Sequence, residues 1–115
     1  MNDPTTTVAA PVSLQRIRQV SDQIVRVVAS CKIILFGSHA RGNATADSDV
    51  DLLIVVDRSA GPGESLRIRR SISYDFPLDL VVTSRRRLES RLAMGDFFLK
   101  EAVEGGIVLY EKAHT

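Results

Sequence analysis

The sequence is poor in cysteine, tryptophan and net charge: it has one cysteine, no tryptophan and a formal net charge of +1. A single cysteine cannot form an internal disulfide, and Cys31 lies in no CxxC or histidine-rich pattern that would indicate zinc. We therefore expect Cys31 to be a small buried side chain at the start of a strand. The near-neutral charge gives no overall reason to expect direct nucleic-acid binding.

Long apolar runs are absent as well. No stretch reaches the roughly eighteen consecutive apolar residues that a membrane-spanning helix needs. The N-terminal sequence MNDPTTTVAAPVS has neither the basic head nor the apolar core of a secretory signal. These absences predict a soluble, cytoplasmic protein that makes no membrane contact.

The length and composition indicate one globular domain. The chain has 115 residues, of which 44% are hydrophobic and 25% charged, ordinary proportions for a single core. We expect a single domain over residues 13–112. Residues 1–12 are expected to form a flexible lead-in, and residues 113–115 a short C-terminal tail.

The periodicity of apolar residues predicts alternating helices and strands, and hence an α/β (α+β) fold. Apolar residues at helical spacing follow Ser13, a good N-cap, whereas the strands are short runs rich in β-branched residues. Both early strands are apolar on both faces, which implies helical cover on both sides of a sheet. The expected helices span residues 13–30, 64–74, 84–92 and 96–103, and the expected strands 31–36, 49–57 and 78–84. Residues 107–111 are expected to form a final short strand or an extended tail.

Two aspartates, Asp49 and Asp51, stand one residue apart at the start of the second strand. Because strand side chains alternate, both carboxylates point to one face, with α-carbons roughly 6.7 Å apart. Asp79 lies on the third strand with Leu78 and Leu80 on the opposite face, so pairing of the two strands could bring all three carboxylates together. Converging carboxylates repel one another, and a divalent metal is the natural remedy. The alternative is a solvated loop that enters the strand late.

The first strand ends at Gly37-Ser38, where phosphate-binding motifs can be tested. A Walker A loop fails, because Asn43 and Ala44 stand where its lysine and hydroxyl residue should be. What remains is a strand, a Gly-Ser turn and a short helical turn whose exposed amides would face an anion, with Ser38 adding a hydroxyl donor. The pair gains its meaning from the ten residues that separate it from the aspartates of residues 49–51.

This composite pattern resembles the polymerase-β-type nucleotidyltransferase superfamily. Its parts are Gly37-Ser38, a ten-residue spacer, Asp49-x-Asp51 and a later strand aspartate, Asp79. The segment FGSHARGNATADSDVDLLIV is similar to the minimal nucleotidyltransferase (MNT) branch, and the closing FLKEAVEGGIVLYE resembles that branch's C-terminal end. The resemblance covers nearly the whole chain and implies a minimal polymerase-β-like fold, a small mixed sheet flanked by helices.

The resemblance also implies roles for these residues. Gly37 and Ser38 would hold the phosphates of the nucleotide. Asp49 and Asp51 would bind two magnesium ions, and Asp79 would complete one metal site near the attacking hydroxyl. All three aspartates would thus be catalytic residues and metal ligands.

Members of the MNT branch are similar to antitoxins encoded beside HEPN-domain ribonuclease toxins. The implied reaction is the magnesium-dependent transfer of AMP from ATP to a tyrosine hydroxyl of the HEPN toxin, with which the antitoxin would form a hetero-oligomer. Two alternatives remain open: a non-catalytic antitoxin that covers the toxin, and a nucleotidyltransferase that acts on a small molecule.

The arginines of the sequence each fit more than one role. Arg41 stands where the MNT branch usually has arginine, and both contact with phosphate and a structural salt bridge within the loop fit that position. The second half of the chain holds a cluster that is either a solvated face or a surface for an acidic partner or phosphate-rich substrate. Its members are Arg67, Arg69, Arg70, Arg85, Arg86, Arg87 and Arg91.

Overall fold

A four-stranded mixed sheet is the centre of the fold. The structure, a computed structural model, describes residues 10–58 and 60–113. In chain order the elements are α1 (Leu14–Val27), β1 (Ser30–Phe36), α2 (Ser38–Arg41), β2 (Val50–Val56), α3 (Glu64–Ser71), β3 (Leu78–Ser84), α4 (Arg85–Ala93), α5 (Phe97–Gly105) and β4 (Ile107–Glu111). The expected α/β class with a small mixed sheet flanked by helices is confirmed.

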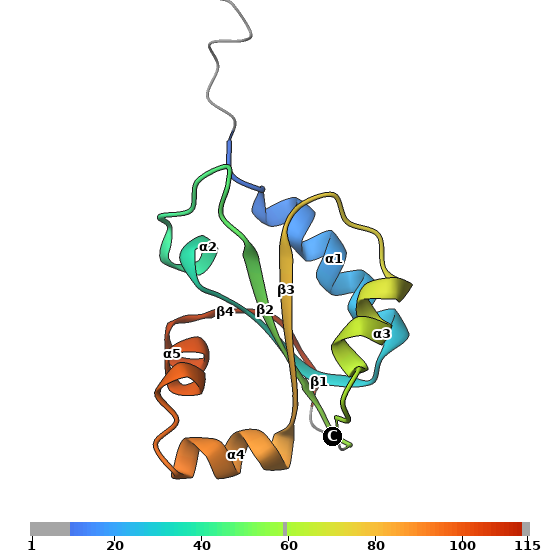
Figure 1. Ribbon diagram of the computed structural model, residues 1–115, viewed down its shortest axis with the longest axis vertical. Coiled ribbons are helices and arrows are strands. Elements are labelled where there is room, and N and C mark those ends of the chain that lie inside the picture. The colour runs from blue at the N-terminus through green and yellow to red at the C-terminus, as the bar shows by residue number, and fades with distance from the viewer. Residues whose placement is uncertain (1–9, 59, 114–115) are drawn as a thin grey trace, which may run out of the picture.

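The strands lie in the order β3-β2-β1-β4. β1 is antiparallel to both of its neighbours, β2 and β4, whereas β2 and β3 run parallel and are joined through α3. As a result, the end of β1 and the beginnings of β2 and β3 meet at one edge of the sheet (Figure 1). This edge carries the sequence motifs.

Helices cover both faces of the sheet, as the doubly apolar strands predicted. Figure 1 shows α1 and α3 on one side and α4 and α5 on the other. The first core joins residues of α1 and α3, such as Ile24 and Ile68, to strand residues such as Leu52. The second, smaller core joins Leu53 of β2 to Leu99 of α5.

α1 begins where the sequence predicted and ends earlier. The Ser13 side chain accepts a hydrogen bond from the backbone N–H of Arg16 and caps the helix. The helix was expected to reach residue 30, but Val28 is already extended, with φ −143° and ψ 141°. Its side chain is 5% exposed and joins the first core, so burial of Val28 favours the early end.

α3 also ends before the expected position, at Ser71 rather than Tyr74. The side chain of Gln23 replaces the missing helical bonds: its Oε1 accepts from the Ser73 N–H at 2.7 Å, and its Nε2 donates to the Ser73 carbonyl at 2.9 Å. Ile72 turns extended and becomes buried. A tertiary contact thus competes successfully with local helix propensity.

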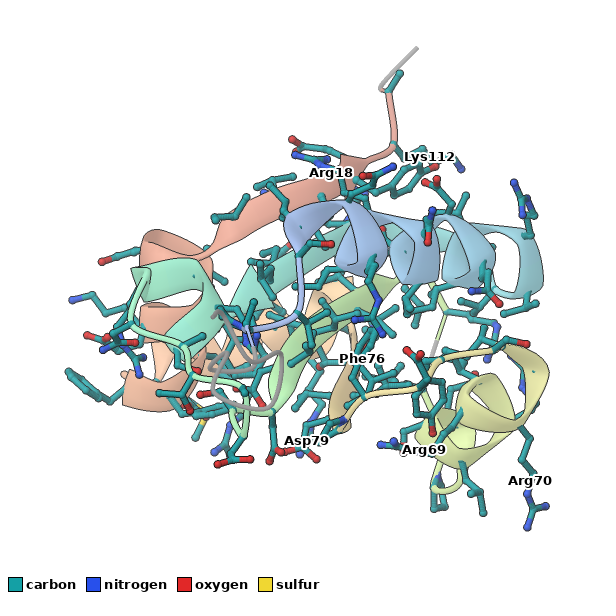
Figure 2. The ribbon with its side chains drawn as sticks, turned by 90° about the horizontal axis from the view of Figure 1, so that it is seen from above. Arg18, Arg69, Arg70, Phe76, Asp79 and Lys112 are labelled. Carbon is teal, nitrogen blue, oxygen red and sulfur yellow. The ribbon has the colours of Figure 1, made fainter. Side chains whose placement is uncertain are left out.

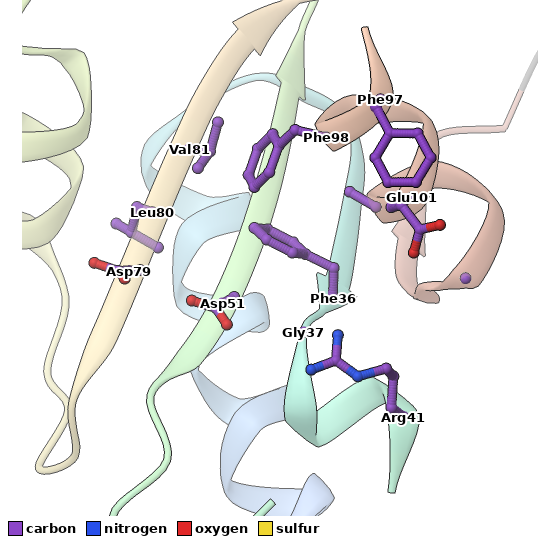
Figure 3. A pocket seen from close by; sticks show the side chains of 12 residues that line it. Phe36, Gly37, Arg41, Asp51, Asp79, Leu80, Val81, Phe97, Phe98 and Glu101 are labelled. Carbon is purple, nitrogen blue, oxygen red and sulfur yellow. The ribbon is translucent and has the colours of Figure 1, made fainter. Parts of the chain in front are cut away.

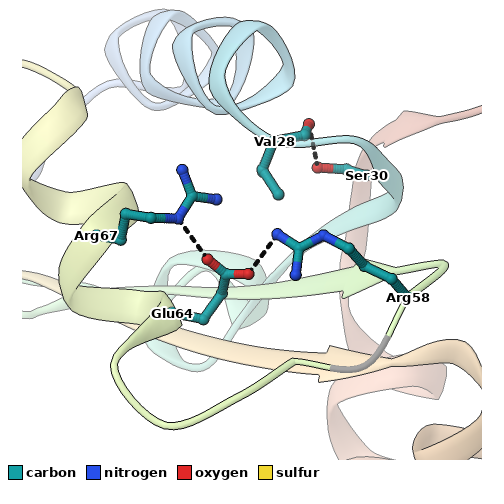
Figure 4. Close-up of polar contacts among 5 residues, drawn as sticks. All are labelled: Val28, Ser30, Arg58, Glu64 and Arg67. Atoms are coloured by element: carbon teal, nitrogen blue, oxygen red, sulfur yellow. Dashed lines mark hydrogen bonds and ion pairs between the residues drawn. The ribbon is translucent and has the colours of Figure 1, made fainter.

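A buried carboxylate fixes the start of α3. Glu64 is only 8% exposed, and it accepts from Arg58 at 2.5 Å and from Arg67 at 2.7 Å (Figure 4). The hydrogen bond from Arg67 lowers the pKa of Glu64, and Arg58 adds to this, against the opposing effect of burial. We call these three residues the α3 clamp.

Some expectations fall outside the described residues. The side chain of Cys31 is one, and residues 1–9 of the expected lead-in and residues 114–115 of the expected tail are others. Within residues 10–58 and 60–113, none of the helices combines the length and apolarity that crossing a membrane requires.

Candidate active site

Strand register brings two predicted site residues, Asp51 and Asp79, into one row with Phe36. Phe36, the last residue of β1, is opposite Asp51 of β2, and Asp51 is opposite Asp79 of β3. By strand alternation, Asp51 and Asp79 lie on the same face as Leu53 and Val81, which pack into the second core. The two carboxylates therefore stand on the face of the sheet that α4 and α5 cover only in part.

The uncovered part of that face forms a pocket of about 590 Å³. Figure 3 shows Asp51 and Asp79 along one side of it, Phe36 at its centre, and α5 along the opposite side. The lining residues are Phe36, Gly37, Arg41, Asp51, Asp79, Leu80, Val81, Phe97, Phe98, Glu101, Ala102 and Gly105. The volume lies in the range typical of small-molecule sites.

Gly37 is required where the backbone passes Asp51. Its φ of 77° and ψ of −154° belong to a region that only glycine adopts without strain. A Cβ at this position would collide with Oδ2 of Asp51 and lie 3.3 Å from its Cγ. The turn and the carboxylate are therefore in direct proximity, and the α2 backbone begins at that point.

The charges around Asp51 are unbalanced. Burial raises the pKa of Asp51, and the negative charges of Asp79 and Asp49 raise it further. His39 and Arg41 act in the opposite direction but do not cancel these effects. Burial and the neighbouring carboxylates thus both disfavour the ionised form of Asp51.

The comparisons with known proteins decide the family. The family model described as “Nucleotidyltransferase domain” matches residues 14–109. The chain belongs to this family. The match includes every element from α1 to most of β4, and hence the whole carboxylate-lined pocket.

Two relatives of this nucleotidyltransferase come from Methanocaldococcus jannaschii, and both are provisionally named protein adenylyltransferases. The first is 35% identical over 79 residues, which cover 69% of this chain and 77% of that protein. The second is 38% identical over 56 residues, covering 44% of this chain and 57% of that protein.

Two solved structures share the fold. One is a provisionally named nucleotidyltransferase from Sulfolobus solfataricus, with a TM-score of 0.60 and 17% identity over 86% of this chain and 80% of that one. The other is a chain of a toxin–antitoxin crystallised with AMP-PNP, with a TM-score of 0.62 and 19% identity over 83% of this chain and 73% of that one. At these identities the likeness concerns the fold alone.

Within this nucleotidyltransferase domain, four of the six predicted site residues line one pocket: Gly37, Arg41, Asp51 and Asp79. Ser38 begins α2 directly after Gly37 but is not among the lining residues.

Asp49 directly precedes β2, is exposed and does not line the pocket. Its negative charge nevertheless contributes to the raised pKa of Asp51. The backbone carbonyl of Asp49 accepts a hydrogen bond from Nδ1 of His39 at 3.1 Å. The other ring nitrogen of His39, Nε2, is buried and has no hydrogen-bond partner among the described residues.

The sequence left two interpretations of Arg41 open: contact with phosphate, or a structural salt bridge within the loop. Its side chain is exposed and lines the pocket. Among the residues that the structure describes, none of the ion pairs includes Arg41. Contact of Arg41 with phosphate stays a prediction.

Sequence reasoning missed the aromatic side of the pocket. Phe36 was read only as part of a strand, yet its ring meets Phe98 of α5 edge to face, with centroids 5.5 Å apart. In the triplet of residues 97–99, Leu99 is buried, whereas Phe97 and Phe98 are 72% and 53% exposed. Periodicity places such residues on a helix but does not reveal what faces them.

The arginine cluster is less open than the sequence suggested. Arg67 and Arg91 pair with Glu64 and Asp96, and Arg85 with Asp57. Arg69 donates to the Leu78 carbonyl at 2.6 Å and to the Tyr74 hydroxyl at 3.2 Å. The other three members are exposed, and Figure 2 shows one of them, Arg70, projecting from α3 away from Asp79.

Proposed function

We propose that this nucleotidyltransferase transfers AMP from ATP to a tyrosine hydroxyl of a HEPN-type ribonuclease toxin and so acts as its antitoxin in the cytoplasm. The observation that carries the chemical part is the in-register pair Asp51 and Asp79 beside Gly37 at the side of a pocket. The names of the two archaeal relatives support adenylyl transfer to a protein. The toxin–antitoxin fold neighbour supports a toxin partner.

The donor set suits magnesium. Mg²⁺ is usually held by one or two carboxylates together with water and substrate phosphates. Asp51 and Asp79 provide two carboxylates on adjacent strands, and Asp49 adds charge nearby. Among the described residues, no group of three or more His, Cys, Asp or Glu side chains is gathered closely enough to hold a metal by itself. If ATP phosphates complete the ligand shell of the magnesium, two protein carboxylates are sufficient and a group of three protein ligands is not needed.

Each residue of the phosphate turn has a distinct role in this proposal. Gly37 lets the backbone approach the carboxylates, so that the phosphates are held against them. Ser38 supplies a hydroxyl and, with the following residues, backbone N–H groups at the start of α2. Arg41 reaches the same pocket from α2 and contributes positive charge to the phosphates.

The reaction is an in-line displacement at the α-phosphorus of ATP. The oxygen of the acceptor hydroxyl forms a bond to that phosphorus, and the bond between the phosphorus and the bridging oxygen toward the β-phosphate breaks. Pyrophosphate leaves with that electron pair, and the hydroxyl proton passes to the carboxylate of Asp79 or through it to water. Bound magnesium would neutralise the charge that develops on the phosphate oxygens.

Positioning is the main catalytic contribution of the chain itself. Asp51 is fixed by two neighbouring strands and by the close approach of Gly37, so its carboxylate has little freedom to reorganise. Asp79 is exposed on the edge strand β3, which makes it the carboxylate that an incoming acceptor reaches.

Intact-mass spectrometry tests this proposal. The purified protein is incubated with ATP, Mg²⁺ and the product of the adjacent gene, and the masses of both chains are measured. We expect the neighbour to gain one or more adenylyl groups, with no gain when Mg²⁺ is chelated. A stable complex without any mass gain would instead indicate an antitoxin that acts by binding alone.

A matched pair of variants locates the chemistry. Asp51→Asn with Asp79→Asn removes the carboxylate pair and is expected to abolish transfer. Asp47→Asn makes the same kind of substitution, with the loss of one negative charge, at an exposed turn residue outside the pocket and should leave transfer intact. Transfer by the double variant at the unmodified rate would remove these carboxylates from the mechanism.

A further inference from the structure

The pocket is larger than a phosphate site requires. Its carboxylates, Gly37 and Arg41 lie toward one end, and α5 forms the other side (Figure 3). Beyond the carboxylates the wall is apolar and aromatic, with Phe98 of α5 and Val81 of β3 near Phe36. A triphosphate bound at the carboxylates would leave this wall uncovered.

The aromatic wall is both exposed and held in place. The Phe98 side chain is 53% exposed although it packs edge to face against Phe36. Phe36 directly precedes the Gly37-Ser38 turn, so the wall and the phosphate turn are parts of one strand end. α5 is itself anchored, because Asp96 accepts from the Leu99 N–H at 3.0 Å and pairs with Arg91.

We propose that Phe98, supported by Phe36, is the platform on which the purine base of the nucleotide stacks. This inference rests on the proposed function, since it assigns the base of the same nucleotide whose phosphates lie at Gly37 and the carboxylates. An aromatic ring offers any base a π-face to stack on. The exposed ring face of Phe98 would be buried by the base, which accounts for a large apolar side chain being left open to solvent.

Glu101 gives the same wall a means of selection. It is the only charged side chain that α5 contributes to the pocket lining. A carboxylate accepts hydrogen bonds and donates none when ionised. It therefore matches the exocyclic amino group of adenine and is opposed by the carbonyl oxygen that uracil carries at the corresponding edge.

The affinities for ATP and for inorganic tripolyphosphate separate the contribution of the base platform from that of the phosphate site, because tripolyphosphate has no base. Both ligands are titrated calorimetrically with Mg²⁺ into the unmodified protein and into Phe98→Ala. We expect Phe98→Ala to weaken ATP binding by roughly 5- to 100-fold, the range found when stacked aromatics are removed. Tripolyphosphate binding should not change.

Two further variants control for packing and for a different occupant. Phe98→Leu keeps an apolar side chain against Phe36, so the wall remains filled while the π-face is lost. Met94→Ala removes another exposed apolar side chain, 74% exposed, that lies just before α5 and does not line the pocket. Because Met94 does not line the pocket, Met94→Ala should leave ATP affinity unchanged and any complex with the neighbour intact.

The outcomes distinguish this inference from the proposed function. If the unmodified protein binds neither ligand, the nucleotide function itself fails and the base platform with it. If tripolyphosphate and ATP bind equally well, or if Phe98→Leu binds ATP as the unmodified protein does, the platform is overturned while the phosphate site stands. Loss of complex formation in both Phe98→Ala and Met94→Ala, with ATP affinity unchanged, would assign the patch to a partner protein instead.

A specificity measurement tests Glu101 separately. The unmodified protein should bind ATP more tightly than UTP. Glu101→Gln adds an amide donor that tolerates the uracil carbonyl, so the ratio of ATP to UTP affinity should fall by roughly tenfold. A ratio that stays the same would remove Glu101 from base selection.

Discussion

At the scale of single residues, the site depends on how closely a backbone and a carboxylate approach. Gly37 and Asp51 are fourteen positions apart in the sequence, and the antiparallel pairing of β1 with β2 brings them together. The sequence predicted that both residues belong to one site. It did not show that a side chain at position 37 would collide with Asp51. This requirement for glycine arises only from the register of β1 and β2 in the folded protein.

Two glycine variants separate backbone strain from loss of the site. Gly37→Ala places a side chain in a glycine-only region and against Asp51, and we expect a loss of about 2–3 kcal/mol in the free energy of unfolding. Gly42→Ala also meets a positive φ, 82°, but a Cβ there has nothing within 4 Å, so about 1 kcal/mol is expected.

Chemical denaturation measures these two losses, and an adenylyl-transfer assay on the same samples measures function. Gly42→Ala should retain transfer, whereas Gly37→Ala should lose it even under conditions in which the variant is folded. Equal activity of the two variants would contradict the assigned contact between Gly37 and the carboxylates.

Asp51 should reduce the stability of the metal-free protein. Its raised pKa means that the folded state binds the proton more tightly than the unfolded chain does. Stability therefore falls as pH rises from the ordinary carboxyl value of 3.8 through the raised native value, and it stays lower above that. With a chelator present, Asp51→Asn should melt at a higher temperature than the unmodified protein at neutral pH.

The advantage of Asp51→Asn should disappear as pH falls well below the ordinary carboxyl value of 3.8, where the carboxyl group is protonated in both states. Thermal unfolding followed by circular dichroism across this pH range makes the comparison. Asp47→Asn serves as the control, because it removes one negative charge from an exposed turn. A destabilised Asp51→Asn at neutral pH would show that Asp51 is a structural residue.

At the scale of elements, the sequence was most successful where apolar runs have sharp limits. β3 and β4 occupy the predicted residues 78–84 and 107–111, because each run is bounded by residues that cannot extend it, such as Pro77 and Gly106. A Cβ on Gly106 would collide with the Ala102 carbonyl and the Ile34 side chain, so this glycine also allows α5 to lie against β1. The ends of α1 and α3 were placed too late, since burial of Val28 and the Gln23 contacts are tertiary.

The α3 clamp was not predicted, because a glutamate at the start of a helix is ordinarily a solvated residue. Glu64→Gln keeps the shape of the side chain but removes the charge that Arg58 and Arg67 share. We expect a loss of about 1–3 kcal/mol in the free energy of unfolding at neutral pH. Transfer activity should persist in the folded variant, because α3 packs on the face of the sheet opposite the pocket.

The pH dependence of this loss follows from the lowered pKa of Glu64. A carboxyl group whose native pKa lies below its ordinary value, 4.5, stabilises the fold above that value and loses its contribution as pH falls through the native pKa. The difference between Glu64→Gln and the unmodified protein should thus shrink in acid. Urea unfolding at neutral and acidic pH measures it, and a difference independent of pH would indicate a packing effect.

At the scale of the whole molecule, strand order converts scattered motifs into one site. The motifs at residues 37–38, 49–51 and 79 predicted a carboxylate site, and the order β3-β2-β1 at a single sheet edge explains why they meet. The aromatic side of the pocket could not be predicted in this way, because Phe36 and Phe98 meet only through the packing of α5 on β1. Local patterns contain no information about such a contact.

The proposed reaction at this carboxylate-lined edge transfers a nucleotide rather than a phosphate to the acceptor. The most direct measurement uses ATP labelled at either the α- or the γ-phosphorus, with Mg²⁺ and the product of the adjacent gene. We expect the α-label to become attached to the neighbouring protein and the γ-label to be released as pyrophosphate in an equal amount. Neither should happen with the double variant Asp51→Asn with Asp79→Asn. Attachment of the γ-label, or transfer of the α-label by that double variant, would contradict the proposed reaction.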